Sequence, residues 1–214
     1  MDFADERIAL LEREFRRQKW EEQEKEKQEA APKEEAKTLS FEEILAGVRE
    51  GGLVFPNKET FYFEIREYFE DQIPMARFSH FFTAVEEKEG VTIYVNHDRE
   101  VSQLITVADK PHQKESMDVW KKRMENGMRA VGTYAKVEKK QELNYVDYLS
   151  YRTPTKKGWV FNLIFRVRYG SSRVIGNYNC YEKDKETIGL ILEALICRMD
   201  ELLTERSRKE KKED

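Results

Sequence analysis

The sequence predicts an α+β fold, in which an antiparallel sheet of about six to eight strands is sandwiched between helices. Three observations lead to this prediction. Apolar residues alternate with polar ones along several short segments, which is the two-residue period of a strand. Other segments carry apolar residues three or four positions apart, as on one face of a helix. Short polar turns join neighbouring strand segments, which favours antiparallel pairing.

The first 38 residues are highly charged and predict a helical arm or linker outside the folded domain. Ile8, Leu11 and Phe15 form a short apolar stripe, whereas residues 21–38 are almost entirely polar. A helix that is polar on all sides buries nothing. We therefore expect residues 5–20 to dock, either on the body or on a second subunit. Docking on a second subunit would make a homodimer through this N-terminal helix.

The folded domain is predicted to span residues 39–206, followed by a disordered charged tail over 207–214. Its first helix starts at Ser40 and Glu43, which have the spacing of a capping box, and ends at Gly51-Gly52. Strands are expected at residues 61–65, 78–87, 91–96 and 101–108, with a turn at 70–74 and a hairpin turn at 88–90.

A second helix is predicted at residues 116–131, with Ser116 as its N-cap. Trp120, Met124 and Met128 mark its apolar face, and Gly127 inside it suggests close packing against the sheet. Two further strands are expected at residues 133–138 and 143–151, followed by a turn at 154–158.

Residues 158–203 predict a central hairpin of the sheet and a helix laid across it. Every second residue from Trp159 to Tyr169 is apolar, a turn follows at 170–172, and residues 173–181 run back. The segment 160–166 is apolar on both faces, which is typical of a strand covered from both sides. A helix then follows from Thr187, and its apolar face is formed by Ile188, Ile191, Leu192, Leu195, Met199 and Leu202.

Composition and charge exclude several classes of function. The chain has 214 residues and a formal net charge of −4, whereas proteins that neutralise phosphates show clustered excess Lys and Arg, so we expect no nucleic-acid partner. No apolar run is long enough to predict a membrane span. The first residues are acidic, unlike a signal peptide, and only Cys180 and Cys197 are cysteines. These features predict a cytoplasmic location without a disulfide framework.

The sequence carries no recognisable catalytic or metal-binding motif. It has no G-x-S-x-G nucleophile elbow and no glycine-rich phosphate-binding loop. Its histidines are His80, His97 and His112, and none has a second histidine four residues away or a C-x-x-C companion. We therefore predict a protein that is not an enzyme and that uses neither a metal nor a cofactor.

The most suggestive polar residues lie on the hairpin of residues 158–181. Arg166 and Arg168 share a face of its first strand, and Arg173, Asn177 and Asn179 share a face of the returning strand. Residues on such strands can be cross-strand neighbours, and arginine is enriched in protein interfaces. We interpret these five residues as a partner-binding surface. The alternative is a solvated sheet edge, or arginines that pair with nearby glutamates.

The same segment carries a resemblance to a known family. The pattern Gly158-Trp159-x-Phe161-x-x-Ile164-Phe165, then Arg173-x-Ile175-Gly176-Asn177-Tyr178-Asn179-Cys180 and a closing amphipathic helix, resembles the end of the PsbP-like sandwich fold. The helix at 116–131 resembles its middle helix, and the similarity covers roughly residues 53–203. This superfamily includes photosystem accessory proteins, a Ran-binding nuclear import factor and bacterial chaperones that load effectors for secretion. The resemblance implies an α/β/α sandwich and offers no shared active site to transfer.

Two functions remain open from the sequence. The first is a non-enzymatic adaptor or chaperone that holds another polypeptide, and a secreted effector is the narrower form of this hypothesis. The second is a small-ligand-binding protein or an enzyme with a pocket between sheet and helices. Such a pocket would be lined by Trp120, Tyr145, Trp159 and Tyr178.

Overall fold

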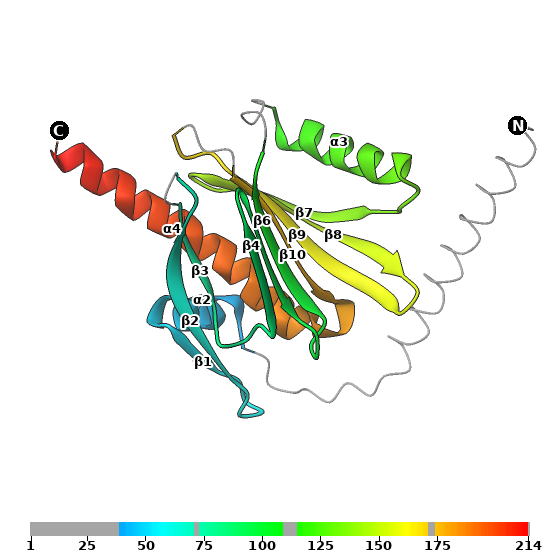
Figure 1. Ribbon diagram of the computed structural model, residues 1–214, viewed down its shortest axis with the longest axis horizontal. Coiled ribbons are helices and arrows are strands. Elements are labelled where there is room, and N and C mark those ends of the chain that lie inside the picture. Colours follow the sequence, from blue (N-terminus) through cyan, green and yellow to red (C-terminus); the bar gives the residue numbers. More distant parts are fainter. Residues whose placement is uncertain (1–38, 71–72, 109–114, 171–173, 214) are drawn as a thin grey trace, which may run out of the picture. The chain divides into compact units, whose positions relative to one another are not determined.

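The computed structural model describes residues 39–70, 73–108, 115–170 and 174–213 (Figure 1). The predicted N-terminal arm, with its proposed dimer contact, lies outside the described residues. From Thr38 onward the chain forms one compact unit. In the described residues this unit is α+β, as predicted, with three α-helices and two antiparallel sheets. The seven-stranded sheet agrees with the predicted six to eight strands, whereas the separate three-stranded sheet was not predicted.

The smaller sheet follows directly from the first helix. Helix α2 (Phe41–Glu50) begins at Ser40 with the predicted capping box, in which the Ser40 hydroxyl and the Glu43 carboxylate each accept from the other residue's backbone N–H. Gly51 ends the helix in the left-handed conformation, with φ 85°. The strands that follow are β1 (Gly52–Val54), β2 (Thr60–Tyr68) and β3 (Ile73–Ser79), in the spatial order β1-β2-β3.

Strand β3 was not expected as a separate element. The sequence suggests a turn at 70–74 and one strand at 78–87, but β3 contains Pro74, and the chain breaks after it at His80, whose φ is 56°. Pro74 is tolerated because β3 is an edge strand that pairs only with β2. Nearly all of β3 is buried, so it lacks the alternation from which a strand is recognised.

The seven-stranded sheet contains the rest of the β structure, and all its pairings are antiparallel. Its spatial order is β4-β5-β6-β10-β9-β8-β7. Strand β10 therefore joins the strands that precede α3 to those that follow it. Gly90, with φ 69°, forms the predicted turn between β4 and β5. The strand bounds are β4 (Ala84–Lys88), β5 (Val91–Asn96), β6 (Val101–Val107), β7 (Lys136–Glu142), β8 (Val146–Thr155), β9 (Gly158–Val167) and β10 (Val174–Tyr181).

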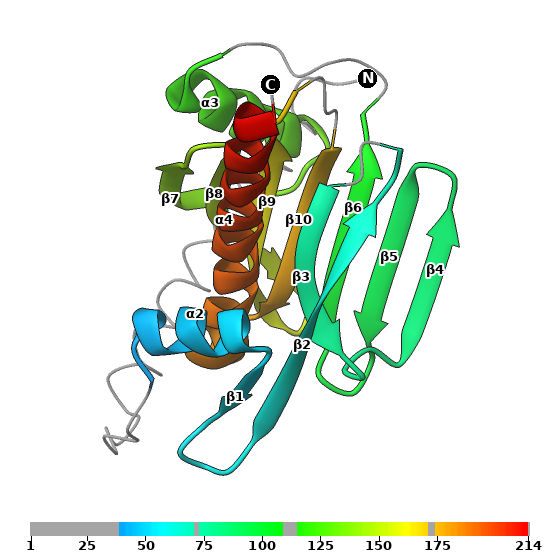
Figure 2. The same cartoon turned by 90° about the vertical axis from the view of Figure 1, so that its left-hand side faces the viewer.

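Helices α3 (Met117–Ala130) and α4 (Leu190–Glu213) lie on opposite faces of this sheet. Tyr148 of β8 donates to Glu193 of α4 from one face, and Arg166 of β9 lies under Trp120 of α3 on the other. Figure 1 shows α3 beside β7, and Figure 2 shows α4 and β3 side by side in front of the large sheet. A 3₁₀ turn (Glu182–Asp184) and a π-helical turn (Lys185–Gly189) connect β10 to α4.

Helix α4 is longer than the sequence suggests. The expected disordered tail at 207–214 does not hold for residues 207–213, which are the last turns of α4. Two tyrosines next to the sheet strands hold them: Tyr145, just before β8, donates to the Ser207 hydroxyl, and Tyr169, after β9, donates to the Glu210 carboxylate. These tertiary contacts stabilise the helical conformation of a charged segment that would not be a stable helix by itself.

The core lies between α4, the small sheet and the inner face of the large sheet. Ile191, Leu195 and Met199 of α4 are fully buried against it. Gly176 of β10 allows the closest approach, because a Cβ atom there would lie 2.2 Å from Cζ of Phe165. Gly127 does not pack closely as expected: a Cβ atom there would have no neighbour within 4 Å.

Candidate functional site

The face of the large sheet opposite α4 remains partly exposed along three neighbouring strands. On β5, β6 and β10 alternate residues are buried toward the core, and the intervening ones are half exposed. The register places Ile93 opposite Leu104, Leu104 opposite Asn177, and Asn177 opposite Ile164 of β9. These side chains therefore form one row across four strands.

We call this surface the open sheet face. Six of its ten members are aliphatic, and the other four carry amides or hydroxyls. The strand geometry directs the side chains of alternate residues to the same face of the sheet. The open sheet face consists of Val91, Ile93, Val95, Ser102, Leu104, Thr106, Ile164, Ile175, Asn177 and Asn179, all of them half exposed.

Two of the residues predicted to bind a partner, Asn177 and Asn179, lie on this face. Asn177 Oδ1 accepts a hydrogen bond from the Tyr151 hydroxyl at 3.1 Å. Asn179 Nδ2 donates to the Ser102 hydroxyl of the neighbouring strand at 2.9 Å. These bonds fix both amide groups beside the aliphatic row.

Arg166 is instead part of a buried ion-pair network beneath α3. Its guanidinium pairs with Asp147 of β8 at 2.9 Å and with Glu115 at 3.1 Å, and it lies 4.5 Å from the ring centroid of Trp120. Arg166 is only 5% exposed. The expectation that it contributes to an exposed contact surface is therefore wrong, because its charge is satisfied inside the protein.

The remaining predicted residues lie elsewhere. Arg168 follows the end of β9 and donates to the Leu143 carbonyl at 2.6 Å. Its Nε also lies 3.0 Å from Asp147 Oδ1, although the geometry there is not that of a hydrogen bond. Arg173 lies outside the described residues. The five predicted residues thus do not form one surface, and the alternative of arginines paired with acidic residues describes Arg166.

The aliphatic members of the open sheet face were not singled out from the sequence. Val91, Ile93 and Val95 were assigned simply to a strand. A signal was present, because β5 carries apolar or aromatic residues on both of its faces, as Tyr94 between Ile93 and Val95 shows. A strand with apolar residues on both faces is expected to be packed against other elements on both sides. In the structure only one face of β5 is fully buried.

The four aromatics proposed to line a ligand pocket do not come together. Trp120 lies over Arg166 on the α3 side of the sheet, whereas Tyr178 is buried toward the core on the other side. Tyr145 packs against Tyr169 near the end of α4. One pocket cannot be formed by side chains on opposite faces of a continuous sheet.

The remaining reactive groups do not form a catalytic or metal-binding centre among the described residues. Burial raises the pKa of the Cys180 and Cys197 thiols to about 12, so both stay protonated at neutral pH. Among the described residues, no group of three or more His, Cys, Asp or Glu side chains lies close enough together to hold a metal ion. His80 and His97 are exposed, and His112 lies outside these ranges. None of the helices in the described part of the chain has the length and apolar character needed to cross a membrane.

Comparison with known proteins does not identify a function for the open sheet face. No protein-family model matches the chain, and no curated protein matches it either. The resemblance to the PsbP-like superfamily therefore stays a prediction from the residues quoted above.

Proposed function

We propose that this protein is a non-enzymatic adaptor or chaperone that holds a segment of another polypeptide on the open sheet face. The observation that carries the proposal is a row of half-buried side chains in register across four strands, in which Asn177 lies between the aliphatic pair Ile93 and Leu104 and the aliphatic Ile164. Contiguous exposed apolar surface rimmed by polar groups is typical of protein-binding sites.

The composition of this face favours a polypeptide over a reacting substrate. Its members include no histidine, cysteine, carboxylate or amine, so it offers no general base and no activated nucleophile. The amides of Asn177, within the row, and of Asn179 can instead exchange hydrogen bonds with peptide groups of a partner. A partner segment with small apolar side chains on one side and polar ones on the other fits this surface.

The narrower parts of the proposal rest on sequence alone. A cytoplasmic location is proposed because the sequence has only two cysteines and so no disulfide framework. A secreted effector as the client follows from the PsbP-like resemblance, which is an analogy of fold and not of a site. A partner other than nucleic acid agrees with the net charge of −4.

Photo-crosslinking from the open sheet face tests the proposal. A photoreactive amino acid at Leu104 in the full chain should crosslink to one polypeptide in cells of the source organism. The same group at Val119 of α3, which is 52% exposed and lies outside the open sheet face, is the matched control and should not. Leu104→Arg should weaken capture of that polypeptide by about tenfold or more, since a charge in an apolar contact is costly.

Thermal unfolding separates loss of binding from loss of folding. Leu104→Arg should unfold within a few degrees of the wild type, because Leu104 is half exposed. Equal capture by the wild type and the folded Leu104→Arg variant would contradict the proposal. So would native mass spectrometry that finds a retained small molecule and no polypeptide.

A further inference from the structure

Helix α3 is attached to the sheet by very little buried surface. Of its residues from Met117 to Ala130, only Trp120 is buried. The other members of its apolar stripe, Met117, Met124 and Met128, are half exposed. Helix α4 contrasts with it, because its hydrophobic residues are buried at successive turns: Ile191, Leu192, Ala194, Leu195, Ile196, Met199 and Leu203.

The Trp120 side chain lies over the guanidinium of Arg166. The distance of 4.5 Å from that guanidinium carbon to the ring centroid is a close cation–π contact. The same guanidinium pairs with Glu115, just before α3, and donates to the Glu115 carbonyl at 3.2 Å. The contacts of α3 with β7 are more peripheral: Asp118 pairs with Lys140, and Glu125 accepts from the Val137 N–H at 3.5 Å.

The sheet surface under α3 continues the open sheet face. Leu149 of β8 is opposite Ile164, so it extends the same row by one strand, and it is 0% exposed. Lys140, which pairs with Asp118 of α3, is opposite Leu149 on β7. Helix α3 therefore covers the end of the aliphatic row that begins on β5.

Separation of α3 would leave Arg166 with an acidic partner on the sheet. Arg166 and Asp147 are partners on neighbouring strands, opposite each other in the register, and their ion pair does not involve α3. Arg168 also lies against Asp147. Removal of α3 thus exposes a paired arginine and does not leave an isolated buried charge, which is the costly case.

We propose that α3 is a lid that opens from the sheet as a unit when Trp120 separates from Arg166, while both sheets and α4 stay folded. Opening exposes Leu149 and the Arg166–Asp147 pair, and it lengthens the open sheet face by one strand. Local opening needs less free energy where fewer apolar contacts are buried. This proposal concerns the chain alone and does not depend on the identity of a partner.

Native-state hydrogen exchange of the full chain, followed by mass spectrometry in low concentrations of urea, tests the lid. After correction for intrinsic rates, amides of residues 120–130 should exchange at least about tenfold faster than those of residues 194–203. Their exchange should also depend only weakly on urea, since little surface is exposed. Trp120→Ala should accelerate exchange in α3 by about tenfold or more and leave α4 unchanged. Val119→Ala, which changes an exposed residue of the same helix, should alter neither.

Three results would overturn the proposal. The first is exchange in α3 that is as slow and as dependent on urea as in α4, because α3 would then open only with the whole domain. The second is equal acceleration of α3, α4 and the strands by Trp120→Ala, which would place Trp120 in the cooperative core. The third is unchanged exchange in α3 after Trp120→Ala, because that side chain would not hold the helix.

Discussion

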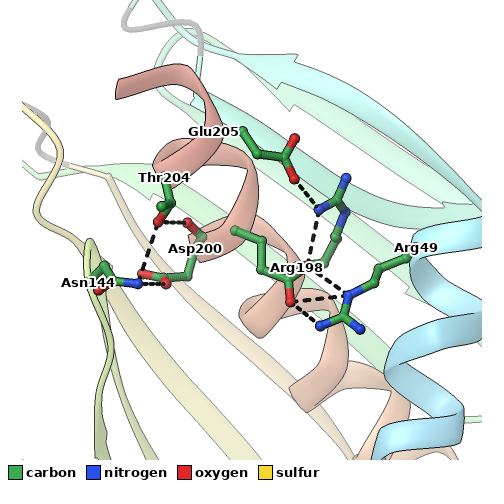
Figure 3. Close-up of polar contacts among 7 residues, drawn as sticks. Arg49, Asn144, Arg198, Asp200, Thr204 and Glu205 are labelled. Atoms are coloured by element: carbon green, nitrogen blue, oxygen red, sulfur yellow. Dashed lines mark hydrogen bonds and ion pairs between the residues drawn. The ribbon is translucent and has the colours of Figure 1, made fainter. Parts of the chain in front are cut away.

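The carboxylate of Asp200, in the middle of α4, accepts a hydrogen bond from the backbone N–H of Tyr145 at 2.6 Å. The same carboxylate accepts from the Val146 N–H at 3.1 Å. It also accepts from Asn144 Nδ2 at 3.1 Å, as Figure 3 shows. Asp200 is only 5% exposed. It therefore caps the backbone donors at the start of β8, and it fixes α4 against the turn that joins β7 to β8.

Asp200→Ala should lower the free energy of unfolding by about 3 kcal/mol, because it leaves buried N–H groups without an acceptor. Asp98→Ala is the matched control, since Asp98 lies in an exposed turn, and its effect should stay within about 0.5 kcal/mol. Urea-induced unfolding measures both. Similar midpoints for the two variants would show that the Asp200 contacts contribute nothing beyond an ordinary surface carboxylate.

Two glycines should respond to alanine in opposite directions. Gly176→Ala places a Cβ atom 2.2 Å from Cζ of Phe165, so it should destabilise the protein by about 3 kcal/mol or more. Gly127→Ala meets open space inside α3 and should raise the helix propensity by about 1 kcal/mol. Its gain in global stability will be smaller where α3 opens separately.

Thermal unfolding measures the stability of the Gly176→Ala and Gly127→Ala variants. A second substitution checks whether contact with Phe165 causes the loss in Gly176→Ala. Phe165→Leu in the Gly176→Ala background should recover part of the lost stability, because it removes the ring atoms that clash. If the double variant is less stable than additive effects predict, contact with Phe165 is not the origin of the loss.

The contact between α2 and α4 should weaken in acid. Glu201 of α4 binds two arginines: Arg49 Nε at 3.0 Å and Arg198 Nη1 at 3.0 Å. Figure 3 shows Arg49 of α2 directed toward α4. Burial by itself raises the pKa of Glu201, but the hydrogen bonds from Arg49 and Arg198 outweigh it and hold that pKa below its usual range.

The direction of the pH dependence follows from the lowered pKa. A carboxylate with a lower pKa in the folded than in the unfolded state stabilises the fold above its unfolded pKa of about 4.3. That stabilisation is lost as the pH falls through the folded pKa. The difference in unfolding free energy between the wild type and Glu201→Gln should therefore be constant from pH 7 to 5 and shrink below about 4.

Unfolding in urea at a series of pH values measures this difference. Glu50→Gln, a change at an exposed carboxylate near the end of α2, serves as the control. A difference between wild type and Glu201→Gln that stays the same down to pH 3 would contradict the assignment of the lowered pKa to the folded state.

Local sequence signals predicted most of the elements. The capping box of α2, the N-cap of α3, the Gly90 turn and the strands β9 and β10 were all expected from residues within a few positions of one another. Strand β3 was missed because Pro74 suggested a turn and because its residues are buried on both sides. Its strand character depends on pairing with β2 and on the cover supplied by α4, neither of which is a local property.

The burial of Arg166 could not be predicted from the sequence. Its position on a strand, and the face that it shares with Arg168, follow from alternation alone. Its partners Asp147 and Glu115 lie 19 and 51 residues away, so whether this arginine is exposed or buried depends on the register of β8 against β9 and on the position of α3. A one-residue change in that register would reverse the face of every side chain.

By itself, the sequence determined the α+β class, the helix caps, the hairpins and the alternation that gives each strand two distinct faces, because these features depend on neighbouring residues. Only the tertiary structure decided which face stays open. Leu104 and Asn177 are neighbours because β6 pairs with β10 across a long intervening stretch of chain, and α3 covers Leu149 while it leaves Ile93 half exposed. Exposure results from packing between distant elements, so the open sheet face exists only once they have assembled.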